Sequence, residues 1–399
     1  MSWQFWAIAA VAITMMQLTG LPTVLSQTPG VRYDPGTAET IPVVTVTQQA
    51  LLHTVQLSAT TIPQSPPQPP ARTEVQRQTQ DILQQLEGLL AESGSDVNKL
   101  LKLHLVATTQ EAMDAAVATI ESRYPIERRP VLSRVISRLP RAGSAVAIDA
   151  VAAVAKSDSQ VQPILNREKK LLGAILPYGP HAYISGQAEP GKTPEEAAAN
   201  TIASLKRTLD FLGARPSDVV QAKCFLTPMS AAVTVSREFD KAFGPSRVPL
   251  VFVEWKSSLP IEIEMITACP PGKTMVPALE FLTPPGMTTP TIYCRVARIQ
   301  TPTLLYLPGL VSRQPGNGEE QVRDIFAQLR TALSSHRSDF RHLVKATYYV
   351  SAEDSSQKLN ELRPLYYDPK RPPAASKAQV SGIGWPNRSI TMDLIAVPK

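Results

Sequence analysis

The segment 243–268, FGPSRVPLVFVEWKSSLPIEIEMITA, contains one arginine, Arg247, and three glutamates, Glu254, Glu262 and Glu264. Read with a period of two, both sides of the run that follows Arg247 are apolar, which predicts a strand buried on both faces. An arginine at the entrance of such a strand lies at the rim or pairs with an anion. Two interpretations stay open: Arg247 pairs with Glu262 or Glu264 and fixes the strand pair, or it holds a carboxylate ligand.

Other residue types that carry chemistry lack the spacing that they would need. The loop PGNGEE at 315–320 has neither the lysine of a phosphate-binding loop nor the glycine spacing of a dinucleotide site. No Ser-His-Asp order or glycine-serine elbow is present. The histidines show no metal-ligand spacing; they are His53, His104, His181, His336 and His342. We therefore expect neither a metal nor a cofactor.

These residues belong to a unit that recurs along the chain about every 121 residues. The triplets SDV (95–97), SDV (217–219) and SDF (338–340) mark the repeat. An amphipathic helix precedes each triplet, and a strand, a second helix and a strand pair follow it. In the second unit Thr193 is the expected N-cap of its first helix, ahead of Pro194.

Each unit also opens with a strand, so its order is β–α–β–α–β–β. This order predicts an α+β fold in which two helices cover a mixed sheet. The expected boundaries are a first unit at 40–156, a second at 170–270, a proline-rich linker at 271–290 and a third unit at 291–399.

The second unit resembles the Rid family, also called YjgF or L-PSP proteins. The resemblance rests on ISGQ (184–187), the strand SDVVQAKCFL (217–226), PSR (245–247) and IEIEMITA (261–268). It implies a chorismate mutase-like domain of the kind that assembles as a trimer, with ligand pockets in the clefts between subunits. Three tandem units then imply that one chain forms a pseudo-trimer, and we expect a monomer.

The resemblance also implies site residues. Family enzymes hydrolyse reactive enamines and imines, such as 2-aminoacrylate, to a 2-keto acid and ammonia. Arg247 matches the arginine that holds the substrate carboxylate, a geometry that suits a planar guanidinium. Glu262 matches the catalytic glutamate, which relays protons when its pKa is raised. Ser185 and Gly186 match the turn that lines the pocket, and Asn360 matches an asparagine of the pocket wall.

The chain departs from the family pattern at several of these positions. Pro249 stands where the family has a pocket cysteine. The counterparts of Arg247 and Glu262 are expected to be Ser376 and Thr391 in the third unit; in the first they are expected to be Val131 and Ala147. The sequence therefore predicts one complete site at most, in the second unit.

Three functions remain open on these residues. The first is an enamine or imine deaminase with one working site, which Arg247 and Glu262 favour. The second is a non-catalytic pseudo-trimer that binds a small carboxylate or a protein, which Pro249 and the degenerate outer units favour. The third is a ribonuclease, an activity attributed to some relatives, but the sequence has no paired catalytic histidines.

Composition narrows the choice of partners. The formal net charge is +6 and the basic residues are scattered without a continuous patch, so we expect no nucleic-acid partner. The three cysteines do not make a disulfide framework, and the pairing of Cys269 with Cys294 stays open. A ligand that bears a small carboxylate is the expected partner.

The first residues, MSWQFWAIAAVAITMMQLTGLPTVLSQTPG, resemble a secretory signal with cleavage after Ser26. The apolar stretch 6–16 is shorter than the ~20 residues that span a bilayer. We expect a signal at 1–26 and export to the periplasm or the medium, without stable membrane insertion after cleavage. An uncleaved anchor and a cytoplasmic chain are the alternatives, since no Lys or Arg precedes the apolar stretch.

Overall fold

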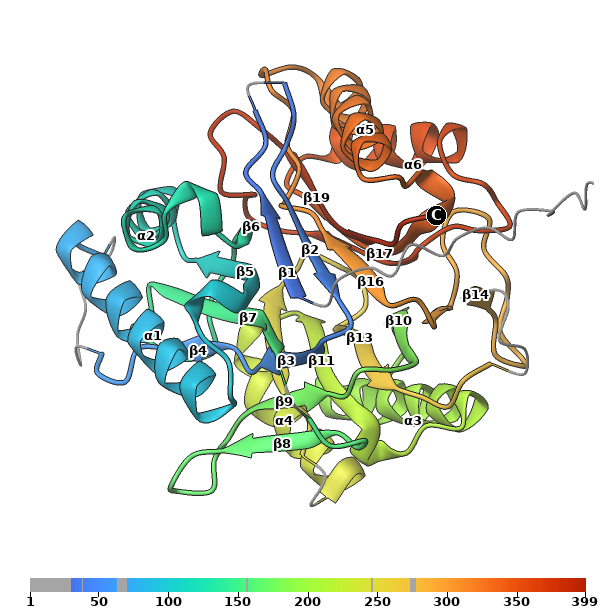
Figure 1. The fold of residues 1–399 in the computed structure, drawn as a ribbon. Helices are drawn as coiled ribbons and strands as arrows, with labels where there is room; N and C mark the ends of the chain where they lie inside the picture. The colour runs from blue at the N-terminus through green and yellow to red at the C-terminus, as the bar shows by residue number, and fades with distance from the viewer. Residues whose placement is uncertain (1–29, 38, 63–69, 156, 245–246, 273–277) are drawn as a thin grey trace, which may run out of the picture.

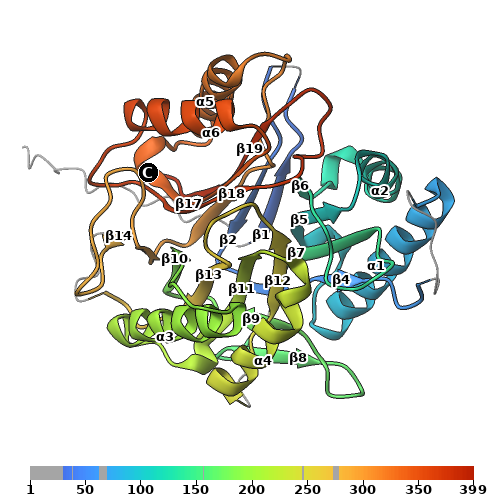
Figure 2. The same ribbon diagram turned by 180° about the vertical axis from the view of Figure 1, so that it is seen from behind.

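The computed structural model describes residues 30–399, apart from 38, 63–69, 156, 245–246 and 273–277. The expected signal at 1–26 therefore lies outside the described residues. Three mixed sheets meet inside the molecule, and three pairs of α-helices lie on its outside (Figures 1 and 2). Among the described helices, none is both long and apolar enough to cross a membrane. The α+β fold that the sequence predicted is confirmed.

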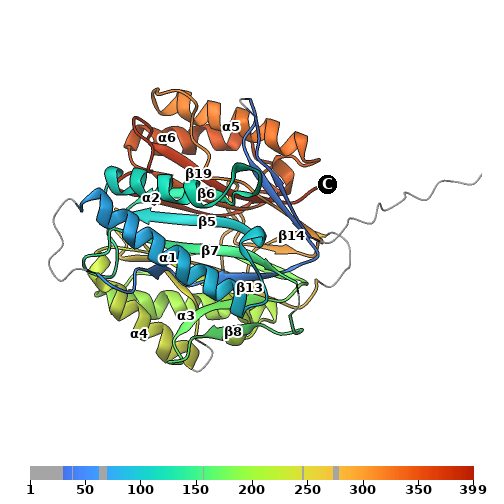
Figure 3. The same ribbon diagram turned by 60° about the vertical axis from the view of Figure 1, so that its left-hand side comes forward.

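The first unit has the expected order of elements. They are β3 (Ala50–Thr54), β4 (Leu57–Ser58), α1 (Arg72–Glu92), β5 (Leu100–Ala107), α2 (Gln110–Arg123), β6 (Val131–Ile136) and β7 (Val146–Val154). Figure 3 shows α1 and α2 side by side over the outer face of this sheet. Their apolar sides form one buried cluster with the outward side chains of the strands.

The second and third units repeat this order. The second consists of β10 (His181–Gln187), α3 (Pro194–Leu212), β11 (Val219–Leu226), α4 (Ala232–Phe243), β12 (Leu250–Glu254) and β13 (Ile261–Ala268). The third consists of β16 (Thr303–Tyr306), α5 (Gly318–Ser335), β17 (Leu343–Val350), α6 (Glu353–Leu362), β18 (Ala374–Gln379) and β19 (Ile390–Ala396). Each of these units buries its own cluster between helices and sheet.

The first helix of the second unit begins and ends as its sequence predicts. The Thr193 hydroxyl accepts a hydrogen bond from the amide of Glu196, at 3.2 Å, and Pro194 occupies the first turn. The helix ends at Gly213, whose φ of +68° suits a residue without a side chain. Both ends of the helix are thus set by local sequence signals.

A β-hairpin precedes each unit in the chain, and each hairpin joins the sheet of a different unit. The hairpin β8 (Gln162–Leu165) and β9 (Leu171–Leu176) extends the first sheet, where β9 pairs with β3. The hairpin β14 (Leu279–Leu282) and β15 (Val296–Ile299) extends the second, where β15 pairs with β10. The hairpin β1 (Gly30–Asp34) and β2 (Val43–Thr47) extends the third, where β2 pairs with β16.

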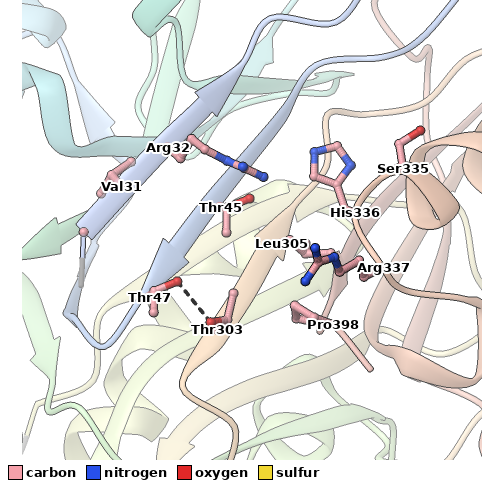
Figure 4. A pocket seen from close by; sticks show the side chains of 11 residues that line it. Val31, Arg32, Thr45, Thr47, Thr303, Leu305, Ser335, His336, Arg337 and Pro398 are labelled. Carbon is pink, nitrogen blue, oxygen red and sulfur yellow. Dashed lines mark hydrogen bonds between the residues drawn. The ribbon is translucent and has the colours of Figure 1, made fainter. Parts of the chain in front are cut away.

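This exchange closes the three units into a ring. In Figure 1 the blue β1–β2 hairpin lies beside β16 of the third unit, far from it in sequence. Gly30 and Pro398, near the two ends of the described chain, line one cavity of about 660 Å³. Figure 4 shows this cavity, with Arg32 on one wall and Arg337 on the opposite one; on its floor the hydroxyls of Thr47 and Thr303 lie 3.0 Å apart.

The sheets therefore do not follow the boundaries expected from the sequence. Segment 40–49 was expected in the first unit, but its strand β2 belongs to the third sheet. Segment 170–180 was expected in the second unit, but its strand β9 belongs to the first sheet. The expected linker 271–290 contains β14, a strand of the second sheet. Pairing between strands that are distant in sequence leaves no local signal. The repeat pattern alone therefore assigned segments 40–49 and 170–180 to the unit that follows each of them.

The inner faces of the three sheets pack against each other at the centre of the molecule. Leu101, Val220 and Val344 occupy matching positions in β5, β11 and β17, and each is fully buried in one shared cluster. A second shared cluster contains Val106, Phe225 and Tyr349, which lie five residues further along the same strands. The chain thus buries within itself the contacts of a three-unit assembly.

Candidate functional site

Glu262 lies on β13 at the boundary between the second and third units. Burial raises the pKa of its carboxyl from 4.5 to about 7, and the nearby negative charge of Glu264 adds to the rise, while a hydrogen bond with Ser376 opposes it. A carboxyl with this pKa is able to hold and release a proton near neutral pH. The elevated pKa expected for Glu262 is present.

The turn at Ser185 and Gly186 lies directly against Glu262. A side chain at Gly186 would overlap the Glu262 carboxylate, so a larger residue there would have to displace Glu262. The Gly186 amide donates to the Ser376 hydroxyl, at 3.1 Å. The Ser185 hydroxyl accepts from the Ala375 amide at 2.8 Å and donates to the carbonyl of Cys294. The polar groups of this turn are thus bonded to β18 and to the β14–β15 hairpin.

Arg247 lies in a different place, at the boundary between the first and second units. It is exposed, precedes β12, and its guanidinium donates to the carbonyl of Lys169 at 2.5 Å. It lines an open cleft of about 1390 Å³ with Arg141 and Lys170, which add positive charge. The acidic residues of the same cleft are Glu168 and Asp240.

The structure does not bring Arg247 and Glu262 together. Glu262 is level with Phe225 of β11, and Phe225 is level with Val253 of the edge strand β12. Arg247 lies six residues before Val253, which corresponds to about 20 Å along a strand. Among the described residues, neither Glu262 nor Glu264 forms an ion pair with Arg247, so the interpretation of an internal ion pair is wrong. The two residues of the second unit therefore lie at different boundaries, Arg247 at the one with the first unit and Glu262 at the one with the third.

Asn360 is also separate from Glu262. It lies on α6, where its side-chain oxygen accepts from Lys377 at 3.2 Å and from Arg363 at 3.3 Å. Lys377 and Ser376 are neighbours on β18 and point to opposite faces of the sheet. Asn360 therefore contacts the helix side of this strand, whereas Glu262 faces its other side. Of the residues that the sequence predicted, Ser185, Gly186 and Glu262 meet in one place.

The strand registers test the expected counterparts in the outer units. Ala147 and Thr391 match Glu262, as expected, because they are level with Val106 and Tyr349 in the way that Glu262 is level with Phe225. The expected match of Arg247 with Ser376 is wrong, because Ser376 is level with Thr347 and so corresponds to Val251. By the same register Val131 corresponds to a position two residues after Arg247. The counterparts of Arg247 are instead Arg129 and Pro372. The shift arises because the units differ by a few residues in loop length.

A buried ionic cluster at the centre of the molecule escaped the sequence analysis. It joins residues of all three units: Lys102, His104, Asp149, Lys223, Glu264, Lys345, Tyr349 and Asp393. Lys345 contacts Glu264 at 2.6 Å, and Lys102 pairs with Asp393. His104 bonds to Asp149 at 2.7 Å. The sequence signal was two polar residues at matching positions of three apolar strands: Lys102 and His104, Gln221 and Lys223, and Lys345 and Thr347. Which of these residues pair depends on how the sheets meet.

The described residues offer neither a grouped set of metal ligands nor a disulfide. In the part of the chain that the structure describes, no three His, Cys, Asp or Glu side chains are grouped so that they could hold a metal ion. Cys224, Cys269 and Cys294 are free thiols, and burial raises the pKa of each one. Cys269 and Cys294 thus form no disulfide.

Comparison with solved structures finds proteins of the YjgF and Rid families. No family model matches the chain, and no curated protein matches it. Similar solved structures include a YjgF family member from Neisseria meningitidis, at 20% identity over 30% of this chain and 95% of that one, with a TM-score of 0.24. A YjgF family member from Mycobacterium tuberculosis has 18% identity over 23% and 77% of the two chains, with a TM-score of 0.22. A Rid family protein from Yersinia pestis has 21% identity over 23% and 79%, with a TM-score of 0.22.

Proposed function

We propose that this chain is a non-catalytic, Rid-like pseudo-trimer that binds a small carboxylate in the cleft at Arg247. One observation carries the proposal: Arg247 lines the cleft between the first and second units, whereas Glu262 is buried against the third unit and is not among the residues that line this cleft. A Rid-like deaminase needs a cation that holds the substrate carboxylate beside a group that moves the proton. Here the cleft that contains the arginine does not contain the glutamate.

The hydrogen bonds around Glu262 indicate that the Ser185–Gly186 turn has a structural role. The Gly186 amide and the Ser185 hydroxyl both bond to the third unit or to its neighbouring hairpin. These groups hold two units together, and a ligand would have to break those bonds to use them. A buried polar group that is already hydrogen-bonded offers little to a second partner.

The surroundings of Arg247 support ligand binding. Its bond to the Lys169 carbonyl uses a single N–H, which leaves other N–H donors of the exposed guanidinium available. Arg141 and Lys170 of the same cleft add positive charge for an anion. A planar fork of this kind binds a carboxylate through two parallel hydrogen bonds, which a lysine cannot do.

Calorimetric titration with pyruvate tests the proposal. We expect one site per chain, and both Arg247→Ala and Arg247→Lys should weaken binding at least about ten-fold, since hydrogen bonds to charged groups contribute about 1.5–3 kcal/mol. Arg237→Ala is the matched control, because Arg237 is an exposed arginine of the same unit that donates to Thr234 and does not line this cleft. Unchanged binding by Arg247→Ala, or equal losses in Arg247→Ala and Arg237→Ala, would contradict the assignment.

A deaminase centred on Glu262 is the second candidate, because its pKa of about 7 suits acid–base chemistry. The chemistry would protonate the enamine carbon of 2-aminoacrylate, and water would then attack the resulting imine carbon and release ammonia. Release of pyruvate and ammonia from 2-aminoacrylate, lost in Glu262→Gln while pyruvate binding persists, would establish this candidate over the first. Turnover that Glu262→Gln leaves unchanged would exclude it.

A further inference from the structure

A cavity apart from Arg247 and Glu262 lies between the exchanged β1–β2 hairpin and the C-terminal end of α5 (Figure 4). Its volume of about 660 Å³ is in the range of small-molecule sites. The hairpin is part of the third sheet, and α5 covers that same sheet. The cavity therefore lies within the third sheet layer and is not one of the clefts between units.

The floor of the cavity is one face of the strands β1, β2 and β16. Two rows of side chains cross these strands, and the members of a row are level with one another on that face. The rows are Arg32–Thr45–Leu305 and Gly30–Thr47–Thr303. The floor is thus largely polar, with three threonines beside one arginine.

Two arginines face each other across this floor. Figure 4 shows the guanidinium groups of Arg32 and Arg337 pointing into the cavity from opposite walls. Both residues are exposed, and neither side chain forms a hydrogen bond or an ion pair with another described residue. Among the described residues that line the cavity, none is acidic. Both positive charges are therefore open to an anion.

One carboxylate, that of Asp34, lies near this wall but faces a different partner. It lies 3.3 Å from Nε2 of the buried His336, and its other oxygen accepts from the Gly36 amide at 3.0 Å. The Nδ1 atom of His336 lies 2.9 Å from the carbonyl of Ala332, to which it donates, because a carbonyl only accepts. Asp34 is thus engaged outside the cavity lining and leaves the two guanidinium groups unpaired.

The backbone conformation of Arg337 is unusual for an arginine. Its φ is +55°, in the left-handed region that favours glycine. At the corresponding positions after α1 and α3 the chain has glycines, Gly94 with φ of +71° and Gly213 with φ of +68°. A residue with a side chain is strained in this conformation, and such strain is typical of functional positions. The same backbone bond closes all three ends, from Ser95 to Leu90 at 2.8 Å, from Ala214 to Leu209 at 2.9 Å and from Ser338 to Leu333 at 2.8 Å.

We propose that this cavity binds a phosphate monoester with a small hydroxyl-bearing body, its phosphate held between Arg32 and Arg337. A tetrahedral phosphate directs its oxygens several ways and so meets donors on opposite walls, whereas a planar carboxylate presents both oxygens along one edge. The cavity is larger than a phosphate alone. The hydroxyls of Thr47 and Ser335 have lone pairs that can accept from hydroxyl groups of the body. This site is independent of the function proposed above.

Calorimetric titration with glucose 6-phosphate tests the site. The titrations use the Arg247→Ala variant, so that the carboxylate site proposed above does not contribute, and we expect one site per chain. Glucose lacks the phosphate and glucuronate carries a planar carboxylate in its place, so each should bind at least about ten-fold more weakly. Inorganic phosphate lacks the body and should bind several-fold more weakly.

Two further substitutions in that variant locate the ligand. Arg32→Gln and Arg337→Gly should each weaken glucose 6-phosphate binding at least about ten-fold. Because glycine suits a φ of +55°, Arg337→Gly should lose binding without a lower melting temperature, which separates a lost contact from misfolding. Arg323→Gln is the matched control, since Arg323 is an exposed arginine of α5 that pairs with Glu319 and does not line the cavity.

Several results would overturn the proposal. They are unchanged affinity in Arg32→Gln or in Arg337→Gly, equal losses in Arg323→Gln and Arg337→Gly, and equal binding of glucose 6-phosphate and glucuronate. Inorganic phosphate that binds as tightly as the ester would show that the cavity recognises a free anion and not a phosphate ester. The absence of saturable glucose 6-phosphate binding would also overturn the proposal.

Discussion

Two glutamates on β13, Glu262 and Glu264, lie two residues apart and have opposite environments. Glu264 is buried, but Lys345 and Lys223 more than offset that burial and hold its pKa below the ordinary value. Glu262 has no such cation, so burial and the charge of Glu264 raise its pKa to about 7. The ionised carboxylate of Glu264 therefore stabilises the fold, whereas ionisation of Glu262 destabilises it.

Glu262→Gln should stabilise the protein above pH 7. In the unfolded chain the carboxyl ionises near 4.5, and in the folded protein near 7, so folding takes up a proton between these values. Wild-type stability should therefore fall as pH rises from about 4.5 to about 7, by up to ~3 kcal/mol from this residue. Urea denaturation at pH 5 and pH 8 should show a gain of about 1–3 kcal/mol for Glu262→Gln at pH 8 and little change at pH 5.

Glu264→Gln is the matched control on the same strand. It leaves Lys345 and Lys223 buried without their shared carboxylate, so it should destabilise the protein at pH 8 by about 3–5 kcal/mol. A loss of stability of similar size in both variants at pH 8 would contradict the high pKa of Glu262.

At the scale of elements, the exchanged hairpins decide how the units are joined. The β1–β2 hairpin pairs with β16 through four residues of β2, and it contributes Val43 to the core of the third unit. Without it, β16 would be an edge strand with open backbone groups. The loop at Gln48 connects β2 in the third sheet to β3 in the first, so the chain crosses between units at this point.

A circular permutant should fold as the parent does. Its chain would begin at Gln49, run to Lys399 and continue through a short linker into Gly30–Gln48. Gly30 and Pro398 line the same cavity, so the linker spans a small distance. We expect the same circular dichroism spectrum as the parent and a melting temperature within a few degrees of it.

Deletion of the hairpin tests whether the fold needs the hairpin or merely tolerates changes at the chain ends. A chain of residues 49–399 without the linker and hairpin exposes β16 and the core around Val43, and it should aggregate or melt well below the parent. A deletion variant as stable as the permutant would show that the hairpin does not complete the third sheet.

At the scale of the whole molecule, the centre is asymmetric although its three units share one fold. Matching positions hold His104, Lys223 and Thr347, each level with an acidic residue of its own sheet. The pairs between units are unequal: Lys102 binds Asp393, and Lys345 binds Glu264. Because every unit contributes a different partner, one unit cannot be replaced by a copy of another without leaving a buried charge unpaired.

We therefore propose that the chain is a monomer in solution. Its inner sheet faces are buried against each other, and the exchanged hairpins cover β3, β10 and β16. Native mass spectrometry should give the mass of one chain across a wide range of concentrations. A homotrimer would contradict the proposal, because it would require the trimer contacts of the family to form between chains.

The sequence by itself determined the elements and their order. Alternating and continuous apolar runs, the Thr193 cap and the repeated spacing were sufficient for three β–α–β–α–β–β units, because these signals act over a few residues. The match of Glu262 with Ala147 and Thr391 also followed from sequence. So did the contact between the Ser185–Gly186 turn and Glu262, which belong to one sheet.

Only the tertiary structure decided which hairpin joins which sheet and which residues share a cleft. Both depend on pairing between strands that lie far apart in the chain, such as β2 with β16, and on the faces that the units present to one another. In a ring of three units, each unit has two neighbours. Arg247 faces the first unit and Glu262 the third, so two residues fifteen positions apart in the sequence lie at different boundaries between units. Likewise, Arg134 of the first unit stacks on Trp385 only because the connection between β18 and β19 of the third unit crosses the first unit.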